Sequence, residues 1–249
     1  MNREKSGTIA IRILVLGFAL GTPSHGRAQE VKTPYPHMAP LAQYLIADQN
    51  VEIAMARSAA PQAISREAEI LVLGQRGYET AVKGKNGFVC IVERSWMSPF
   101  DTPEFWNPSI RGPICYNPPA ARSILLFTFY RTKLVLAGIS RDQMLKDIRS
   151  ACARKELPSP EPGSMSYMMS KDAYLGDAVR HWHPHLMFHV PKTDGSTWGA
   201  NLSGSPVLLN AQFTQVPEPE TIFMVPLDNW ADGTPAPMPE HDPDGGEKR

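Results

Sequence analysis

Four histidines gather within nine residues of the chain, and they are the side chains best suited to chemistry. They are His181, His183, His185 and His189. Neutral imidazole is a common metal ligand, and its ordinary pKa of about 6.5 also suits proton transfer. Pro184 argues against a helix here and biases His183 toward an extended conformation. The segment is therefore predicted to be a strand whose imidazoles could bind an ion or move a proton.

The spacing of these histidines limits which of them can share a metal ion. On a strand, side chains two residues apart share a face and lie about 7 Å apart, because each residue rises about 3.3 Å. His183 can thus share an ion with His181 or with His185, whereas His185 and His189 lie about 13 Å apart. These considerations give a candidate metal site for zinc or another divalent ion at His181, His183 and His185. Carboxylates that could complete it are Asp172, Asp177 and Asp194. The alternative is a set of structural histidines that hold no ion.

The same strand also predicts a groove for a ligand. Residues Leu186, Phe188 and Val190 alternate with His185, Met187 and His189. We expect the aliphatic and Phe side chains to face the core and the others to face a groove or solvent. A Gly-rich turn follows, with Trp198 and Asn201, that could line such a groove. The candidate ligand-binding residues are His185, His189, Trp198 and Asn201.

Catalytic motifs of defined spacing are absent from the sequence. It holds no G-x-S-x-G, H-E-x-x-H, P-loop or G-x-G-x-x-G pattern, each of which marks a known type of active or nucleotide-binding site. We therefore assign no catalytic residue, and whether the protein is an enzyme stays open.

The patterns of strand and helix residues indicate an α+β fold with an antiparallel sheet. Asn86-Gly87 between two β-rich runs is typical of a hairpin, because a primed turn needs positive φ. We therefore expect a three-stranded meander near 69–94. Further strands are expected near 165–169, 185–190 and 221–225, and helices near 40–60, 118–137 and 141–154. Ser140 to Gln143 is a capping box for the last helix, and 95–117 is interpreted as an aromatic loop over the core.

The cysteine count allows one disulfide and leaves one thiol over. The chain has Cys90, Cys115 and Cys152. In an oxidising compartment we favour the pair Cys90–Cys115, which would stabilise the fold by about 2–4 kcal/mol. Cys115–Cys152 is the rival pairing, and three buried thiols remain a further alternative.

The first 28 residues have the order of a secretory signal peptide. Basic residues precede a short apolar run at 13–20, and the small residues of Gly26-Arg27-Ala28 follow. The apolar run is too short for a membrane span, which needs about 20 residues. We expect cleavage near residue 28, a single α+β domain over 29–230 and a disordered tail at 231–249. Localisation is expected to be periplasmic or secreted, without stable membrane insertion after cleavage.

Charge and composition bear on partners. The chain has 25 basic and 25 acidic residues, and no basic stripe of the kind that nucleic-acid binding requires. Our first hypothesis is an exported protein that binds a small ligand or a partner beside the His181–His189 strand. The alternatives are a hydrolase-like metal-dependent enzyme that uses the histidine cluster, and a cell-envelope interaction protein that uses the aromatic loop 95–117.

Overall fold

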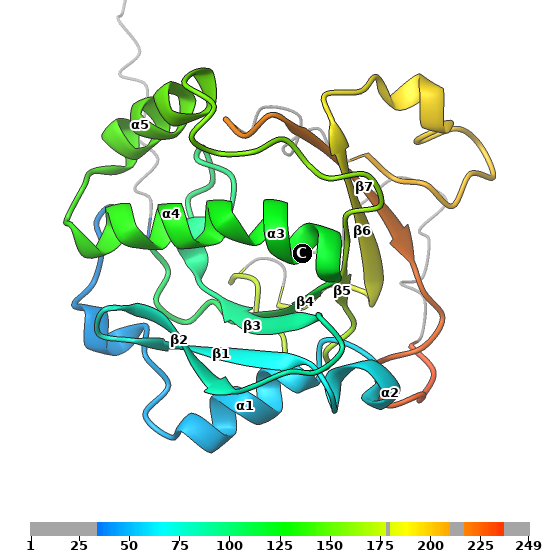
Figure 1. The fold of residues 1–249 in the computed structure, drawn as a ribbon, viewed down its shortest axis with the longest axis horizontal. Coiled ribbons are helices and arrows are strands. Elements are labelled where there is room, and N and C mark those ends of the chain that lie inside the picture. Colours follow the sequence, from blue (N-terminus) through cyan, green and yellow to red (C-terminus); the bar gives the residue numbers. More distant parts are fainter. Residues whose placement is uncertain (1–33, 178–179, 210–216, 237–249) are drawn as a thin grey trace, which may run out of the picture. The chain divides into compact units, whose positions relative to one another are not determined.

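Seven strands form a single, strongly twisted sheet with the order β2-β1-β3-β4-β5-β6-β7 (Figure 1). The strands are β1 (Glu69–Gly74), β2 (Gly77–Val82), β3 (Val89–Glu93), β4 (Gly112–Tyr116), β5 (Met165–Met168), β6 (His185–Pro191) and β7 (Glu220–Pro226). Neighbouring strands are antiparallel except β1 and β3, which are parallel. The computed structural model describes residues 34–177, 180–209 and 217–236. The predicted signal peptide lies outside these residues, and the predicted α+β class with an antiparallel sheet is confirmed.

Helices form in all three of the predicted regions. They are α1 (Gln49–Arg57), α3 (Pro118–Ser123), α4 (Leu125–Leu136) and α5 (Arg141–Ala153), and the short α2 (Gln62–Ser65) follows the first predicted region. Asp48 caps α1 by accepting from the amide of Asn50 at 2.9 Å, and Ser140 caps α5 by accepting from the amide of Gln143. The side chain of Gln143 bonds to Asp147 instead of closing the capping box. Within the described residues, no helix has both the length and the apolar character needed to cross a membrane.

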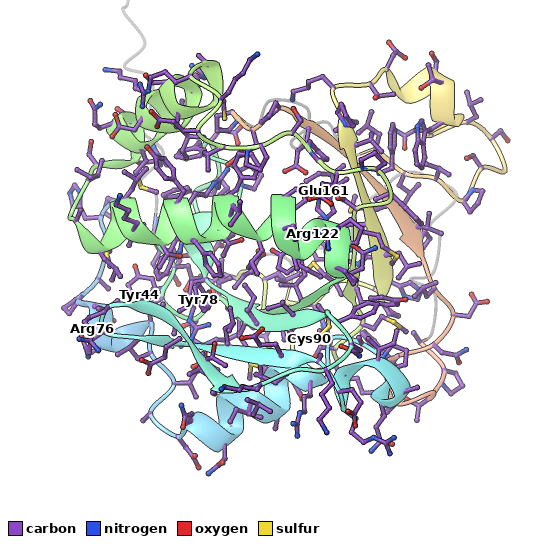
Figure 2. All side chains as sticks on the ribbon, viewed as in Figure 1. Tyr44, Arg76, Tyr78, Cys90, Arg122 and Glu161 are labelled. Carbon is purple, nitrogen blue, oxygen red and sulfur yellow. A yellow bond between two sulfur atoms is a disulfide. The ribbon has the colours of Figure 1, made fainter. Side chains whose placement is uncertain are left out.

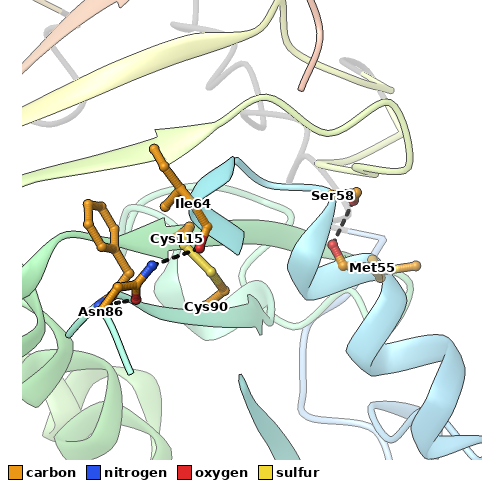
Figure 3. Close-up of a disulfide and its surroundings, with 7 residues drawn as sticks. Met55, Ser58, Ile64, Asn86, Cys90 and Cys115 are labelled. Carbon is orange, nitrogen blue, oxygen red and sulfur yellow. Dashed lines mark hydrogen bonds between the residues drawn. A yellow bond between two sulfur atoms is a disulfide. The ribbon is translucent and has the colours of Figure 1, made fainter. Parts of the chain in front are cut away.

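The predicted meander is wrong in the place of its third strand. β1 and β2 form a hairpin, but β3 pairs with β1 and not with β2. The reason lies in Asn86, whose side chain donates to the carbonyl of Ile64 and accepts from the amide of Phe88 (Figure 3). Gly84 passes so close to β1 that a Cβ on it would lie 2.2 Å from the amide nitrogen of Glu69. The segment therefore crosses the end of β1 instead of turning back along β2.

A fully buried strand, β4, lies inside the segment that the sequence indicated as a loop. It pairs with β3 along its whole length and places Cys115 directly opposite Cys90. These two cysteines form a disulfide (Figure 3), as favoured from the sequence. Cys152 is free. The rings of Trp96, Phe105 and Trp106 are buried, so the segment does not present them as an exposed contact surface.

The two faces of the sheet are covered by different helices (Figure 1). α1 covers one face, where alanines of the helix and of the turn after it contact Ile70, Cys90 and Cys115. α3 and α4 cover the other face, where Ile91, Ile114 and Met187 contact the start of α4. α5 packs on the outer side of α4 through Ile148 and Ala151. Consecutive strand residues therefore alternate between an α1 side and an α4 side, and the disulfide lies on the α1 side.

Two surface segments complete the described domain. The crossover from α5 to β5 runs beside α3, where Glu161 forms an ion pair with Arg122 at 2.7 Å (Figure 2). At the other end, residues 231–236 fall in the predicted tail but are hydrogen-bonded to the domain. Ala231 donates to the carbonyl of Met169, and Ala236 is buried and donates to that of Asp228. Residues 231–236 are thus part of the folded domain.

Candidate functional site

A cavity of about 380 Å³ lies on the α4 side of the sheet, between the strands, the start of α4 and the segment 97–112. Its wall is mostly apolar. The apolar lining includes Ile110, Ile114, Phe127, Met168, Met187 and Ile222. Small-molecule sites in proteins have volumes of about 300–1,000 Å³ and are lined mainly by apolar side chains. The size and lining of this cavity therefore suit a small organic molecule.

Strand alternation places a row of polar side chains on the same face. The members are Glu93 on β3, Tyr116 on β4, Ser166 on β5, His189 on β6 and Glu220 on β7. Each lies two residues from an apolar side chain that faces α4 or the cavity, such as Ile91, Ile114 or Met187. Because side chains two apart on a strand share a face, neighbouring strands bring these groups together. Tyr116, for example, lies opposite Ser166 in the register of β4 and β5.

Glu93 is the first polar feature of the cavity wall. Its Oε1 accepts a 2.5 Å hydrogen bond from the Tyr116 hydroxyl and a 3.3 Å hydrogen bond from Thr128 of α4. The side chain lies deep in the protein but retains accessible surface, and since it lines the cavity this surface faces into it. Burial raises the pKa of Glu93, an effect that these hydrogen bonds and the charges of Arg131 and His189 oppose without cancelling.

His189 is held on both sides of its ring. Nδ1 lies 2.8 Å from Oε2 of Glu220, and Nε2 lies 3.0 Å from the Ser166 hydroxyl. The order hydroxyl, imidazole, carboxylate is that of a nucleophile with its base and orienting acid. However, Ser166 is fully buried and is not part of the cavity wall. A substrate in the cavity could not reach the hydroxyl, so these contacts orient the His189 ring at the wall and do not build a nucleophile.

Arg131 of α4 forms a buried ion pair with Glu218. The two side chains are 3% and 4% exposed, and the guanidinium contacts both carboxylate oxygens, at 2.7 and 3.0 Å. Its Nη1 also donates to the carbonyls of Trp96 and Ser98, each at 3.0 Å, and the group lies over the Phe100 ring. This arginine is thus held by protein partners, and it fixes the segment after β3 against α4.

Of the four ligand-binding residues proposed from the sequence, the structure places only His189 in the cavity wall. His185 faces the same side and is buried, where it bonds through Nδ1 to the carbonyl of His183. Burial lowers the pKa of His185. Trp198 stacks on Phe223 at 4.5 Å, and the side chain of Asn201 bonds to the backbone of Leu209. Both contacts are those of a packed turn.

The prediction of which face of β6 is turned to the core is partly wrong. His185, Met187 and His189 are buried, whereas Leu186, Phe188 and Val190 are half-buried. The apolar residues were expected to face the core, but the packing of α3 and α4 buries the other face more deeply.

Two of the three predicted metal ligands lie beside Trp230. His181 stacks on Trp230 at 5.6 Å, and the ring of His183 lies 6.4 Å from it. The Nε2 atoms of His183 and His185 are buried and have no hydrogen-bond partner among the described residues. Within those residues, no group of three or more His, Cys, Asp or Glu side chains is placed to hold a metal ion. The hypothesis of a metal-dependent enzyme therefore stays a prediction, and the described residues supply no set of metal ligands for it.

Sequence reasoning missed the acidic and phenolic part of the site. Glu93 ends the β-rich run Val89 to Glu93, and its position two residues after Ile91 was the one signal that could have placed its carboxylate on the face of Ile91. Glu218 and Glu220 are distant in the chain from Arg131 and His189, so their pairing had no local signal. Comparisons with protein-family models, with curated proteins and with solved structures found no match, so the geometry of the cavity alone bears on function.

Proposed function

We propose that the protein binds a small, mostly apolar molecule in the cavity between the sheet and α4. The observation that carries this proposal is the cavity itself, about 380 Å³ with a largely apolar wall and a few buried polar groups. Burying an apolar molecule there is favourable by about 25 cal/mol for each Å² removed from water. This proposal retains the expected position beside the His181–His189 strand, because Met187 and His189 form part of the wall.

The polar groups of the wall support a binding site with fixed geometry. Arg131 and His189 are each paired with a glutamate, and Glu93 is bonded to two hydroxyls. Groups held in this way need little reorganisation when a ligand enters, which favours affinity.

Filling the cavity from within tests the proposal. Met168 lines the cavity from β5, and Met168→Trp would place an indole in it. Met165 lies on the same strand but on the other face and is not part of the wall, so Met165→Trp is a matched control. Binding of the uncharged probe 2-acetylnaphthalene, measured by calorimetry, should be lost in the first variant and kept in the second. No binding to the wild type, or equal binding to both variants, would overturn the proposal.

We further infer that the chain is exported and works in the periplasm or outside the cell. Two features support this: the signal-like order of the first 28 residues, and the disulfide Cys90–Cys115, since disulfides persist in oxidising compartments. Expression of the full chain in a bacterial host, followed by fractionation and N-terminal sequencing, tests it. A product in the periplasm that begins near Gln29 is expected, and an uncleaved product in the cytoplasm would contradict it.

A further inference from the structure

The carboxyl group of Glu93 differs from the other carboxyl groups of the cavity in its partners. Glu218 and Glu220 each contact a cationic or ionisable partner, Arg131 and His189. Glu104 accepts from the side-chain amide of Asn107 through Oε2 and from the backbone amide of Asp177 through Oε1. The partners of Glu93 are two hydroxyls, and both donate to Oε1.

The second oxygen of Glu93 is turned to the cavity. Within the described residues, Oε2 has no hydrogen-bond partner. It is also absent from the fully buried side-chain atoms that have no partner. It therefore keeps accessible surface, and the space beside Glu93 is the cavity. A ligand atom that enters this end of the cavity would be the natural partner of Oε2.

The surroundings of Glu93 favour its neutral form. Removal from water destabilises a carboxylate more than a carboxylic acid, and burial is the largest influence on the pKa of Glu93, which is raised. The ionisable groups that face it are Tyr78 on β2, Tyr116 on β4, Arg131 on α4 and His189 on β6. The last two lower the pKa but do not reverse its direction. Because Oε1 already accepts two hydrogen bonds, the proton of the neutral acid belongs on Oε2.

We propose that Glu93 acts as a protonated carboxyl group whose Oε2 hydroxyl donates a hydrogen bond to the carbonyl oxygen of an uncharged, otherwise apolar ligand. The inference rests on the cavity being a ligand site. A carbonyl fits because it accepts a hydrogen bond without a charge of its own, whereas a ligand carboxylate would meet Glu218 and Glu220 in the same wall. Glu93 thereby determines specificity, since it distinguishes a ketone from a hydrocarbon of the same shape.

Two naphthalenes of nearly equal shape test the proposal by calorimetry. 2-Acetylnaphthalene has the carbonyl oxygen and 2-ethylnaphthalene lacks it. The quantity of interest is the ratio of their affinities, compared between wild type and Glu93→Leu, so that the difference in their hydration cancels. Near pH 5 this ratio should be about tenfold higher in the wild type, the size expected of one buried hydrogen bond. The hydrocarbon should bind both proteins.

Glu93→Gln separates the proton from the shape of the side chain. A glutamine amide can accept from Tyr116 and Thr128 through Oε1 and donate from Nε2, as the neutral acid does from Oε2. The preference for the ketone should therefore persist in Glu93→Gln from about pH 5 to about pH 9. In the wild type it should fall as pH rises through the raised pKa of Glu93. The glutamine variant keeps every other ionisable group of the cavity, so it isolates the effect of Glu93.

The outcomes distinguish this inference from the proposed function. If neither naphthalene binds, the ligand site itself is refuted and the role of Glu93 with it. If both bind with the same affinity ratio in wild type and Glu93→Leu, the cavity stands and the role of Glu93 is refuted. Tighter binding of 1-(2-naphthyl)ethylamine than of the ketone in the wild type, but not in Glu93→Gln, would show an ionised Glu93 and overturn the neutral form. Should Glu93→Leu fail to fold, parallel pH profiles of wild type and Glu93→Gln would equally overturn the proposal.

Discussion

The ion pair of Arg131 and Glu218 gives a sharp test of how this site is held together. Both side chains are almost fully buried, and the guanidinium makes two hydrogen bonds to the carboxylate and two to backbone carbonyls. Arg131→Met removes the charge and the donors but keeps an unbranched apolar stem of similar length. It leaves Glu218 as an uncompensated charge in the protein interior. Removing one partner of a buried pair destabilises a protein by about 3–5 kcal/mol.

The surface pair of Arg122 and Glu161 is a matched control for this change. Its shortest nitrogen–oxygen distance is also 2.7 Å, but its side chains are 60% and 39% exposed. Water and salt screen such a pair, so Arg122→Met should cost much less stability than Arg131→Met. The two variants therefore make the same chemical change at the same distance and differ mainly in burial.

Urea unfolding followed by circular dichroism measures both losses as changes in the free energy of unfolding. We expect Arg131→Met to lose several times more stability than Arg122→Met. The double variant Arg131→Met/Glu218→Met should regain much of that loss, because it removes the unpaired charge. Equal losses in the two single variants, or no recovery in the double variant, would refute the view that desolvation of this pair dominates.

Three further predictions concern other parts of the fold. Replacing Cys90 and Cys115 together by alanine should lower the free energy of unfolding, measured in urea, by about 2–4 kcal/mol. Ligand binding, measured by calorimetry, should persist because the disulfide lies on the α1 side of the sheet. Loss of binding in a folded variant would contradict this prediction. Gly84→Ala should destabilise the protein measurably in the same unfolding assay, because the Cβ of the alanine would lie 2.2 Å from the amide nitrogen of Glu69. Unchanged stability would contradict that close approach. Burial raises the pKa of the Cys152 thiol to about 11. Its reaction with a maleimide, followed by mass spectrometry, should therefore be slow in the native protein at neutral pH and fast after unfolding. Equal rates in the two states would contradict this prediction.

The sequence predicted those elements that local signals define. The predicted cap at Ser140 is a chemical feature at the start of its helix, and its side chain accepts from the amide of Gln143 in the structure. β4 was missed because its signal is non-local. Its five residues include Pro113 and lie in an aromatic, proline-rich segment, and they form a strand because β3 and β5 lie on either side.

The error at Asn86-Gly87 has the same origin. The dipeptide is a strong hairpin signal, and Gly87 does adopt a positive φ of 78°. The side chain of Asn86 nevertheless bonds to Ile64, which lies before β1. A contact across 22 residues thus decided where the next strand would pair, and no window of sequence around the turn contains it.

The candidate site was predictable only in part for a related reason. His189 came from its type and its place on a strand, but its partners Glu220 and Ser166 are on two different neighbouring strands. The clustering that first drew attention to the histidines proved a poor guide to their neighbours. His181 and His183 lie beside Trp230, and His189 contacts Ser166 and Glu220. Each of these histidines thus meets residues more than 20 positions away.

The polar row across the α4 side of the sheet supports a role for the cavity beyond packing. Each ionisable group buried there loses its hydration, and this cost is offset only where hydrogen bonds within the protein replace those to water. An apolar side chain of similar size is often no less stable at such a position than a buried ion pair. Glu93, His189 and Glu220 nevertheless share one face with Ile91, Met187 and Ile222, which show that apolar residues are accepted there. Polar groups that are costly to bury and gathered at one cavity, where they pair with one another or, like Oε2 of Glu93, stay open to the cavity, are the pattern expected of a site that orients a ligand.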